Sequence, residues 1–351
     1  MGSGQLALSN YELARVSIAL VDVDGVTRLD NRPNVRCYAA SIMKLAVAVA
    51  VLRELDRGTL SPDDHLSFDG GFFSGLDGSR FFVDDDSSDQ ELCSADLIGG
   101  GTELSRGGEL GQTGELNRGG ELGRGVRSGD AGGISTFGEA GEVFPSHWVR
   151  RESDAGLELG EAGERGAGVS VARALCRSIT VSSNEGANLL MQAVGLEAIN
   201  WVLLEAGCNN SVVERMVFDG PARDAGRTNT LTALDAAQLM WSIRFGTLAS
   251  DASLTHLCEV LRAQTQRSMT ALALSEAMGR GEVVVGNKEG QTSDVLHDVA
   301  FVEPDDTYPF VLAVCTTGMT EQAATDAVRK IATYAYENKF SAKDFHENLF
   351  S

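Results

Sequence analysis

Long hydrophobic runs, paired cysteines and clustered histidines are all missing from this chain of 351 residues. The longest obvious apolar run, "LAVAVAVL" at 45–52, has eight residues, whereas a membrane-spanning helix needs about 20, so we expect no membrane insertion. None of the six cysteines forms a C-x-x-C pair, and the five histidines are scattered. We therefore expect reduced thiols, no metal site and no cofactor.

Basic residues are also few, since 29 of them face 50 acidic residues and the formal net charge is −21. This imbalance argues against binding to nucleic acid or anionic membranes by bulk electrostatics. The first residues show no basic segment followed by a continuous apolar one, so no signal peptide is visible. We expect a cytoplasmic protein, or a secreted or periplasmic one if a leader was removed. Nothing in the sequence indicates an oligomeric state.

Strand patterns occur at both ends of the chain and helix patterns in the middle. Residues 14–23, "ARVSIALVDV", predict a strand, as do "GEVVVGNKEG", "DVAFVEPD" and "PFVLAVCTTG" near the C-terminus. The pattern predicts an α/β (α+β) fold, with one sheet built from both termini and a helical subdomain inserted between them. We place the α/β subdomain at 10–60 together with 255–345, and the helical subdomain at 61–254.

The composition changes between about 68 and 168, where glycine and acidic residues dominate. Glu-Leu pairs recur every six residues from 103 to 121, and residues 82–168 hold 18 acidic against 7 basic residues. Such acidic, glycine-rich sequence is typical of flexible segments. We predict a flexible insertion within the helical subdomain.

Ser41 and Lys44 form an S-x-x-K motif at the expected start of the helix "SIMKLAVAVAVLRELDRGTL", which should end near Arg57 and Gly58. The i, i+3 spacing puts the hydroxyl and the ammonium on one helix face. A partly buried lysine there can lose its charge and accept the serine proton. Alone the motif is weak, because serine is also a common helix cap.

Two further short motifs follow along the chain. In "SSN" at 182–184, the Ser182 hydroxyl can relay a proton and Asn184 can bind a substrate amide, although Ser183 or Asn184 could equally cap the next helix. In "KEG" at 288–290, Lys288 either ends a strand as a solvated charge or forms one wall of an active site. Gly290 would let a substrate lie against the backbone.

Together, S-x-x-K, S-x-N and K-x-G resemble the signature of the penicillin-recognising serine enzymes, class A β-lactamases in particular. The resemblance covers roughly residues 12–67 and 169–340 and implies a β-lactamase/transpeptidase-like antiparallel sheet flanked by helices. It implies that Ser41 is the acylated nucleophile and Lys44 its proton acceptor, with Ser182 and Lys288 assisting. The implied substrate-binding residues are Asn184, Glu289, Gly290, Gln291 and Thr292, and the backbone N–H groups of Ser41 and Gln291 would form the oxyanion hole.

The chain departs from the family pattern at several positions. Ser183 replaces an aspartate that is largely structural, and Glu289 replaces a threonine or serine that helps to hold the carboxylate of a β-lactam. Glu289 would repel an anionic substrate unless it pairs with Lys288 or points away. His297 is the nearest candidate for the family's arginine on the next strand. The omega-loop acid that activates the deacylating water has no clear match, and Glu214 and Asp219 are the nearest candidates.

We therefore expect a serine acyl-transfer enzyme acting on a small-molecule amide or ester, with a β-lactam as one candidate. A D-Ala-D-Ala peptidase and a biosynthetic acyltransferase or esterase are alternatives. A catalytically weak binding or accessory protein on the same fold is the alternative of another class. The family places the 68–168 region at the active-site rim, so the insertion is either a disordered expansion or a lid with aromatic contacts from "GGFFSG" and "SRFFVDD".

Overall fold

The structure, a computed structural model, describes residue 6 and residues 8–67, 72–73, 80–81, 168–264, 269–277, 283–305 and 308–338. At 72–73, 80–81 and 275–277 the description covers the backbone alone. The glycine-rich insertion therefore lies almost entirely outside the described residues, and both interpretations of it, expansion and lid, stay predictions.

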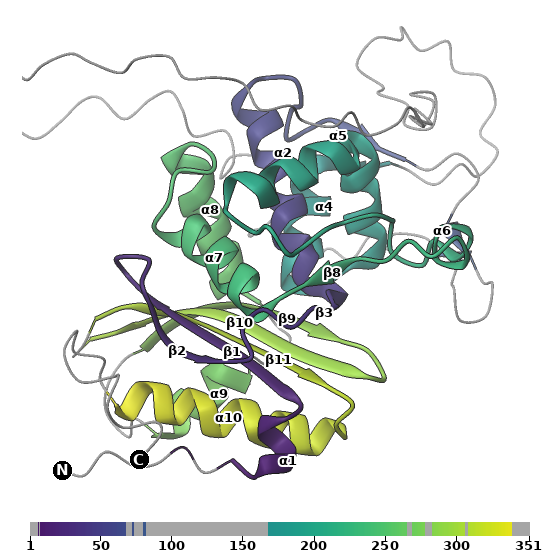
Figure 1. Cartoon of the computed structure of the whole chain (residues 1–351). Coiled ribbons are helices and arrows are strands. Elements are labelled where there is room, and N and C mark those ends of the chain that lie inside the picture. Colours follow the sequence, from purple (N-terminus) through teal and green to yellow (C-terminus); the bar gives the residue numbers. More distant parts are fainter. Residues whose placement is uncertain are drawn as a thin grey trace, which may run out of the picture.

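A five-stranded antiparallel sheet with strand order β2-β1-β11-β10-β9 forms the centre of the molecule (Figure 1). Its strands in chain order are β1 (Val16–Asp22), β2 (Thr27–Asn31), β9 (Val283–Gln291), β10 (Val295–Pro304) and β11 (Phe310–Thr317). The pairing of β1 with β11 sets Val16 opposite Thr316. The prediction of one sheet built from both termini is thus confirmed.

Three short ladders lie outside this sheet. They pair β3 (Cys37–Tyr38) with β8 (Thr230–Leu231), β4 (His65–Leu66) with β7 (Val169–Ser170), and β5 (Phe72–Phe73) with β6 (Arg80–Phe81). The first of them matters for the site, because β3 is the segment that leads into the S-x-x-K motif.

Helices cover both faces of the sheet (Figure 1). One face carries α9 (Met269–Ala277) and α10 (Glu321–Glu337), with α1 (Asn10–Leu13) beside them. The other face carries α2 (Lys44–Asp56), α4 (Val171–Thr180), α5 (Asn184–Glu205), α7 (Ala233–Arg244) and α8 (Asp251–Arg262), and α6 (Gly220–Asp224) lies in the connection after α5. Alternate residues of β11 enter the two cores: Leu312 and Val314 face α10, whereas Ala313 and Cys315 face the helical side.

The helix α2 is the centre of the helical layer. Its first nine residues, from Lys44 to Leu52, are all buried, and α4, α5, α7 and α8 contact it. A helix that is apolar on every side is normally buried in a core. Because Lys44 is the first residue of α2, its side chain is buried there too. As predicted, α2 ends just before Gly58, whose φ of 71° suits glycine.

The subdomain boundaries that we placed at residues 60/61 and 254/255 stay a prediction, although the second falls inside α8. Among the described residues, α5 is the one helix long and apolar enough to cross a membrane by length and composition. Its backbone is kinked at Gly195 (φ 80°), and its buried residues pack in the helical core.

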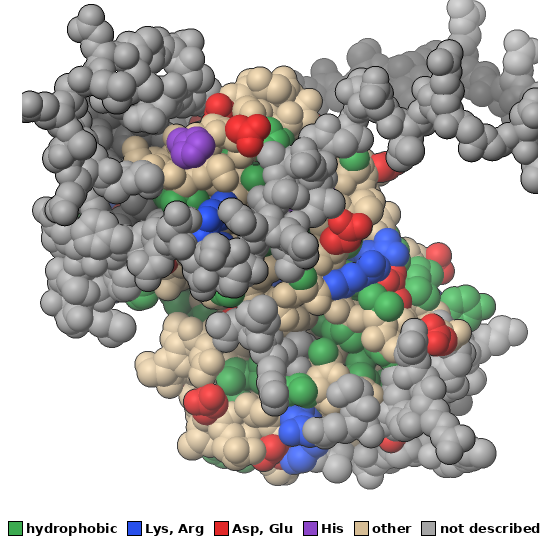
Figure 2. Space-filling model, turned by 180° about the vertical axis from the view of Figure 1, so that it is seen from behind, with side chains coloured by type: hydrophobic (Ala, Val, Ile, Leu, Met, Phe, Trp, Pro, Cys, Tyr) green, Lys and Arg blue, Asp and Glu red, His purple; other side chains and the backbone are tan. Residues whose placement is uncertain are grey.

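Cys176 is disulfide-bonded, so the expectation of reduced thiols is wrong for this residue, while Cys37, Cys208, Cys258 and Cys315 are free. On the face seen in Figure 2, the charged side chains of the described residues lie in small separate groups rather than in one patch of a single sign.

Candidate active site

Ser41 lies in a short 3-10 helix, η1 (Ala40–Met43), that continues directly into α2. Ala40, just before it, has a φ of 44°, a conformation that costs energy for a residue with a side chain. A Cβ atom on Gly290 of β9 would lie 3.2 Å from the backbone N of Ser41 and 3.1 Å from Ala40 Cβ. Because Gly290 has no side chain, the last residues of β9 can approach the backbone of Ser41, the candidate nucleophile.

Lys44 is completely buried, and its ammonium faces the break between α4 and α5. Its Nζ donates to Ser182 O at 2.5 Å, to Asn184 Oδ1 at 2.8 Å and to Ser182 Oγ at 3.3 Å. Burial, and secondly the positive charge of Lys288, lowers the pKa of Lys44 to about 7. A lysine with this pKa is available as a proton acceptor near neutral pH.

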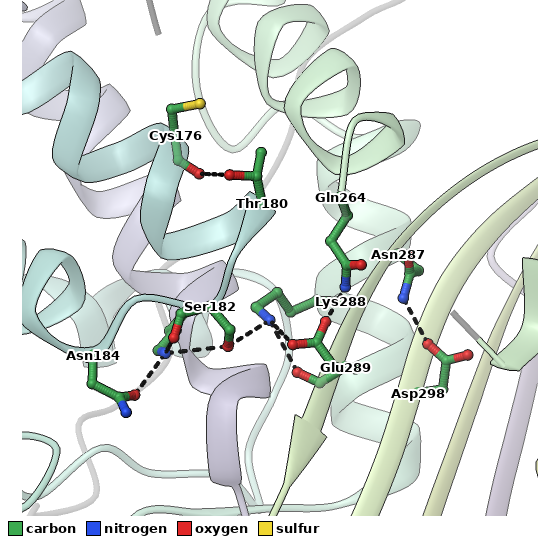
Figure 3. Close-up of polar contacts among 10 residues, drawn as sticks. Cys176, Thr180, Ser182, Asn184, Gln264, Asn287, Lys288, Glu289 and Asp298 are labelled. Carbon is green, nitrogen blue, oxygen red and sulfur yellow. Dashed lines mark hydrogen bonds and ion pairs between the residues drawn. The ribbon is translucent and has the colours of Figure 1, made fainter. Parts of the chain in front are cut away.

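Ser182 occupies the break between the two helices with a φ of 56°, the left-handed region that residues with side chains rarely adopt. Its Oγ accepts a hydrogen bond from Lys288 Nζ at 3.0 Å (Figure 3). It also accepts one from Lys44 Nζ at 3.3 Å. Because the two ammonium groups come from opposite layers, Ser182 joins the helical side of the site to the sheet.

The cap interpretation of "SSN" holds for Ser183 alone. Ser183 Oγ accepts from Gly186 N at 3.0 Å as the N-cap of α5 and donates to Glu185 Oε2 at 2.9 Å. Ser182 and Asn184 instead face the lysines. Ser183 therefore caps the helix, whereas Ser182 and Asn184 contact the buried lysine side chains.

Lys288 is completely buried on β9, and Glu289 is its partner. Lys288 Nζ donates to Glu289 Oε1 at 2.9 Å and to Glu289 O at 3.1 Å, and Gln264 Nε2 donates to the second carboxylate oxygen, Oε2 (Figure 3). Burial lowers the pKa of Lys288, and the carboxylate of Glu289 opposes that change. Of the two arrangements considered for Glu289, the structure shows pairing with Lys288.

Gln291 and Thr292 lie at the exposed end of this strand. Gln291 is the last residue of β9, opposite Leu296. Thr292 belongs to the turn into β10, where its Oγ1 accepts from Asp294 N and Val295 N, both at 3.3 Å. The Thr292 hydroxyl is therefore part of the turn.

The two candidate deacylation acids are both bonded to their own loop. Exposed Glu214 accepts from Thr228 N at 3.0 Å through Oε2, and Asp219 caps α6 by accepting from Ala222 N at 2.9 Å. Within the described part of the chain, neither acid is hydrogen-bonded to Ser41 or Lys44, so their role stays a prediction.

Sequence reasoning missed the buried amides that hold this loop. Asn188 of α5 donates to Val217 O at 3.0 Å and accepts from Val217 N at 2.8 Å. Asn229 accepts from the backbone N of Glu214 and of Arg215. Side-chain amides that substitute for backbone partners have no periodicity, so no sequence pattern could have indicated them.

His297, the nearest candidate for the family's arginine, lies beneath the segment that leads to Ser41. It is completely buried, and its Nε2 lies 2.9 Å from Tyr38 O. Gln264, which fixes Glu289, was not predicted either, because it follows α8 and comes close to β9 only in the folded chain.

Comparison with solved structures agrees with the fold. A β-lactamase from Sphaerobacter thermophilus DSM 20745 has a similar fold, with a TM-score of 0.60 and 19% identity over 95% of this chain and 98% of that one. A β-lactamase from Xanthomonas campestris pv. campestris (TM-score 0.59, 17% identity, 92% and 91% coverage) and PBP-A (0.57, 16%, 92% and 89%) are similar too.

At the level of sequence, no protein of curated function matches the chain significantly. The profile of the Beta-lactamase enzyme family matches residues 5–79 and 150–338, which is more than half of the sequence and includes all three motifs. The chain belongs to the beta-lactamase enzyme family.

Proposed function

We propose that the protein is a serine hydrolase that cleaves an ester or amide through an acyl-Ser41 intermediate. The observation that carries this proposal is the position of Ser182 Oγ, which accepts from Lys44 at 3.3 Å and from Lys288 at 3.0 Å. A hydroxyl between two buried ammonium groups can pass a proton to a leaving group without a water molecule. Membership of the beta-lactamase enzyme family supports the same reaction class.

Acylation begins with transfer of the Ser41 proton to Lys44. The pKa of about 7 leaves a substantial fraction of free amine at neutral pH, and the i, i+3 spacing sets the two side chains on one helix face. Ser41 Oγ then attacks the substrate carbonyl carbon, and the backbone N–H groups of Ser41 and Gln291 bind the resulting oxyanion. Gly290 lets the end of β9 lie close to the backbone N of Ser41.

Departure of the leaving group needs a proton on its nitrogen or oxygen. Ser182 donates its hydroxyl proton and recovers one from Lys44 or Lys288. Asn184 uses its Oδ1 to hold Lys44, so its amide NH₂ group is left to bind a carbonyl of the acyl side chain.

The charge at Glu289 favours a substrate without a carboxylate beside the scissile bond. Lys288 and Gln264 hold the two oxygens of Glu289, and its side chain is 15% exposed. The carboxylate of Glu289 therefore already balances the positive charge of Lys288 before substrate binds. A penicillin or a D-Ala-D-Ala peptide carries a carboxylate that would meet Glu289, so a neutral ester or amide fits better.

Slow deacylation is favoured by one separate observation. Glu214 and Asp219 are both bonded to their own loop, and without a base the water that hydrolyses the acyl-enzyme is poorly activated. A second candidate function is therefore the binding of an acyl ligand with little turnover. A mutant of PBP-A has been solved as an acyl-enzyme with penicillin G, which is the form that such a protein would hold.

Two esters with the same leaving group test the charge preference: p-nitrophenyl acetate, and the mono-p-nitrophenyl ester of succinate, which carries a carboxylate. We expect the wild type to prefer the neutral ester. In Glu289→Thr, kcat/KM for the anionic ester should rise on the order of tenfold, because one like charge is removed. Glu337→Gln, an exposed acid at the end of α10 on the opposite face of the sheet, is the matched control.

Intact mass after incubation with a fluorophosphonate and with benzylpenicillin tests the acyl-enzyme itself. An adduct that forms in the wild type and not in Ser41→Ala supports the proposal. A penicillin adduct that persists points to the second candidate. Absence of any Ser41-dependent adduct, in a Ser41→Ala pair with matching circular dichroism, would refute both.

A further inference from the structure

A second cluster of reactive side chains lies beneath the segment that leads to Ser41. Gly290, His297 and Cys315 are cross-strand neighbours on β9, β10 and β11, and Cys315 belongs to the core on the helical side of the sheet. The chain from Cys37 to Ser41 crosses this row. Ser41 lies over Gly290 and Tyr38 O lies over His297, while Cys37 reaches Cys315.

The distances within the cluster are short. Cys37 Sγ lies 3.7 Å from His297 Nε2, and the two sulfur atoms and the ring nitrogen all lie within 4.8 Å of one another. His297 and Cys315 are buried, whereas Cys37 is half-exposed. A small reagent can therefore reach Cys37, and the buried thiol of Cys315 stands directly behind it.

The hydrogen bonds of His297 distinguish between a metal centre and a thiol pair. Thr316 N donates to Nδ1 at 3.3 Å, and Nε2 lies 2.9 Å from Tyr38 O. These partners place the ring proton on Nε2, which then donates to Tyr38 O. A metal bound through Nε2 would need that proton on Nδ1, facing the Thr316 N–H group. The arrangement therefore suits thiol chemistry better than metal binding.

We propose that Cys37 and Cys315 form a redox pair, in which a peroxide converts the two thiols into a reversible disulfide next to the active site. The Cys37 thiolate attacks the peroxide, so that an S–O bond forms and the O–O bond breaks, with water as the product after protonation. The sulfur of Cys315 then attacks the sulfenic acid. An S–S bond forms, the S–O bond breaks, and the leaving hydroxide takes the Cys315 proton as a second water. Two electrons pass from the thiols to the peroxide.

The electrostatics assign these roles. The S–H group of Cys315, followed by His297, lowers the pKa of Cys37 far below that of an ordinary thiol, whereas the pKa of Cys315 is raised by the same contact and by burial. Cys37 is thus the attacking thiolate and Cys315 the resolving thiol. When protonated, Cys37 has an alternative acceptor, Leu231 O, at 3.5 Å.

The other free cysteines in the described residues provide an internal comparison. Burial raises the pKa of Cys258 to about 11 and raises that of Cys208 still further, so both should be inert. Cys176 is already disulfide-bonded, and compartments in which such bonds form also supply oxidants.

The test uses the full chain treated with increasing hydrogen peroxide at pH 7, alkylated, and digested without reduction. We expect a linked Cys37–Cys315 peptide at a peroxide concentration at least about tenfold below that which oxidises Cys208 or Cys258, and reversal by dithiothreitol. The linked peptide should be unchanged in the control Cys208→Ser. In Cys315→Ser, a dimedone adduct should accumulate on Cys37.

Three outcomes would overturn the proposal. The first is that Cys37 and Cys315 stay alkylatable at peroxide concentrations that oxidise Cys208. The second is over-oxidation of Cys37 in the wild type while Cys315 keeps its thiol. The third is one equivalent of zinc that survives dialysis, protects the wild type against peroxide and is lost in Cys37→Ser. The wild-type peptide map decides the question even if a cysteine variant fails to fold.

Discussion

A Cβ atom added at Gly290 would lie 3.2 Å from the backbone nitrogen of Ser41. In the proposed reaction, glycine at this position keeps β9 and the segment of Ser41 close enough for two backbone N–H groups to bind one oxyanion. Gly290→Ala should therefore slow acylation of Ser41 by roughly tenfold or more, with a stability loss of about 1 kcal/mol. Reaction rates with a fluorophosphonate and urea unfolding measure the two effects.

Gly220→Ala is the matched control, because nothing lies within 4 Å of the added Cβ there. Its acylation rate should equal that of the wild type. Equal acylation rates in Gly290→Ala and the wild type would show that the close approach at Ser41 has no role in the reaction.

The low pKa of Lys44 predicts how acylation depends on pH. The rate should rise through a pH of about 7 and then level off, as the free amine forms. The positive charge of Lys288 lowers this pKa and the negative charge of Glu289 raises it. The midpoint should therefore shift to higher pH in Lys288→Met and to lower pH in Glu289→Gln. Shifts in the same direction in both variants would contradict this account.

The low pKa of Lys44 also predicts how the stability of the protein depends on pH. Between a pH of about 7 and the ordinary lysine value of 10.5, the unfolded chain binds the Lys44 proton and the native protein does not. The free energy of unfolding should therefore increase with pH across this window. Urea unfolding at pH 7 and pH 9 should show a smaller increase in Lys44→Met than in the wild type.

Ser182 and Ser183 are neighbours in sequence with different tasks, so their alanine variants should differ in kind. Ser182→Ala removes the hydroxyl between the two lysines and should lower kcat by about 10²–10⁴-fold. Ser183→Ala removes the N-cap of α5 and should cost about 1 kcal/mol of stability, with kcat nearly unchanged. Steady-state kinetics and thermal unfolding of the two variants side by side separate these effects; a large fall in kcat in Ser183→Ala alone would reverse the assignment.

Asn188 of α5 should be costly to change, because its side chain holds the loop that follows this helix. It satisfies both the N–H and the C=O of Val217 in the interior, so Asn188→Ala leaves buried backbone groups without partners. We expect a loss of about 2–4 kcal/mol in the free energy of unfolding, measured in urea. The control Asn209→Ala, at an exposed turn, should lose less than about 0.5 kcal/mol. Equal losses would mean that the amide of Asn188 does not hold the loop.

The sequence was sufficient for the sheet and for the order of the three motifs. Periodic apolar residues identify β1, β9, β10 and β11, and the run from Lys44 to Leu52 identifies a core helix. The direction of Glu289 was not predictable, because it depends on the flexible side chain of Lys288 and on Gln264, which is 25 residues away in the chain.

The cluster of two cysteines and one histidine beneath the segment of Ser41 was not predictable from the sequence either. Cys37, His297 and Cys315 are scattered in the sequence and carry no spacing motif, so we expected reduced thiols and no metal site. Only the register of β10 against β11, which sets His297 opposite Cys315, and the path of the chain before Ser41 bring them together. Contacts of this kind depend on tertiary structure and leave no local signal.

The pairing of β1 with β11 has a consequence for biosynthesis. Val16 leaves the ribosome 300 residues before its partner Thr316, so the edge of β1 stays open while almost the whole chain is made. Lys288, which completes the group around Ser182, also arrives late. A nascent chain therefore cannot bring Lys44, Ser182 and Lys288 together until β9 has been made, and long-range pairing of this sort folds slowly.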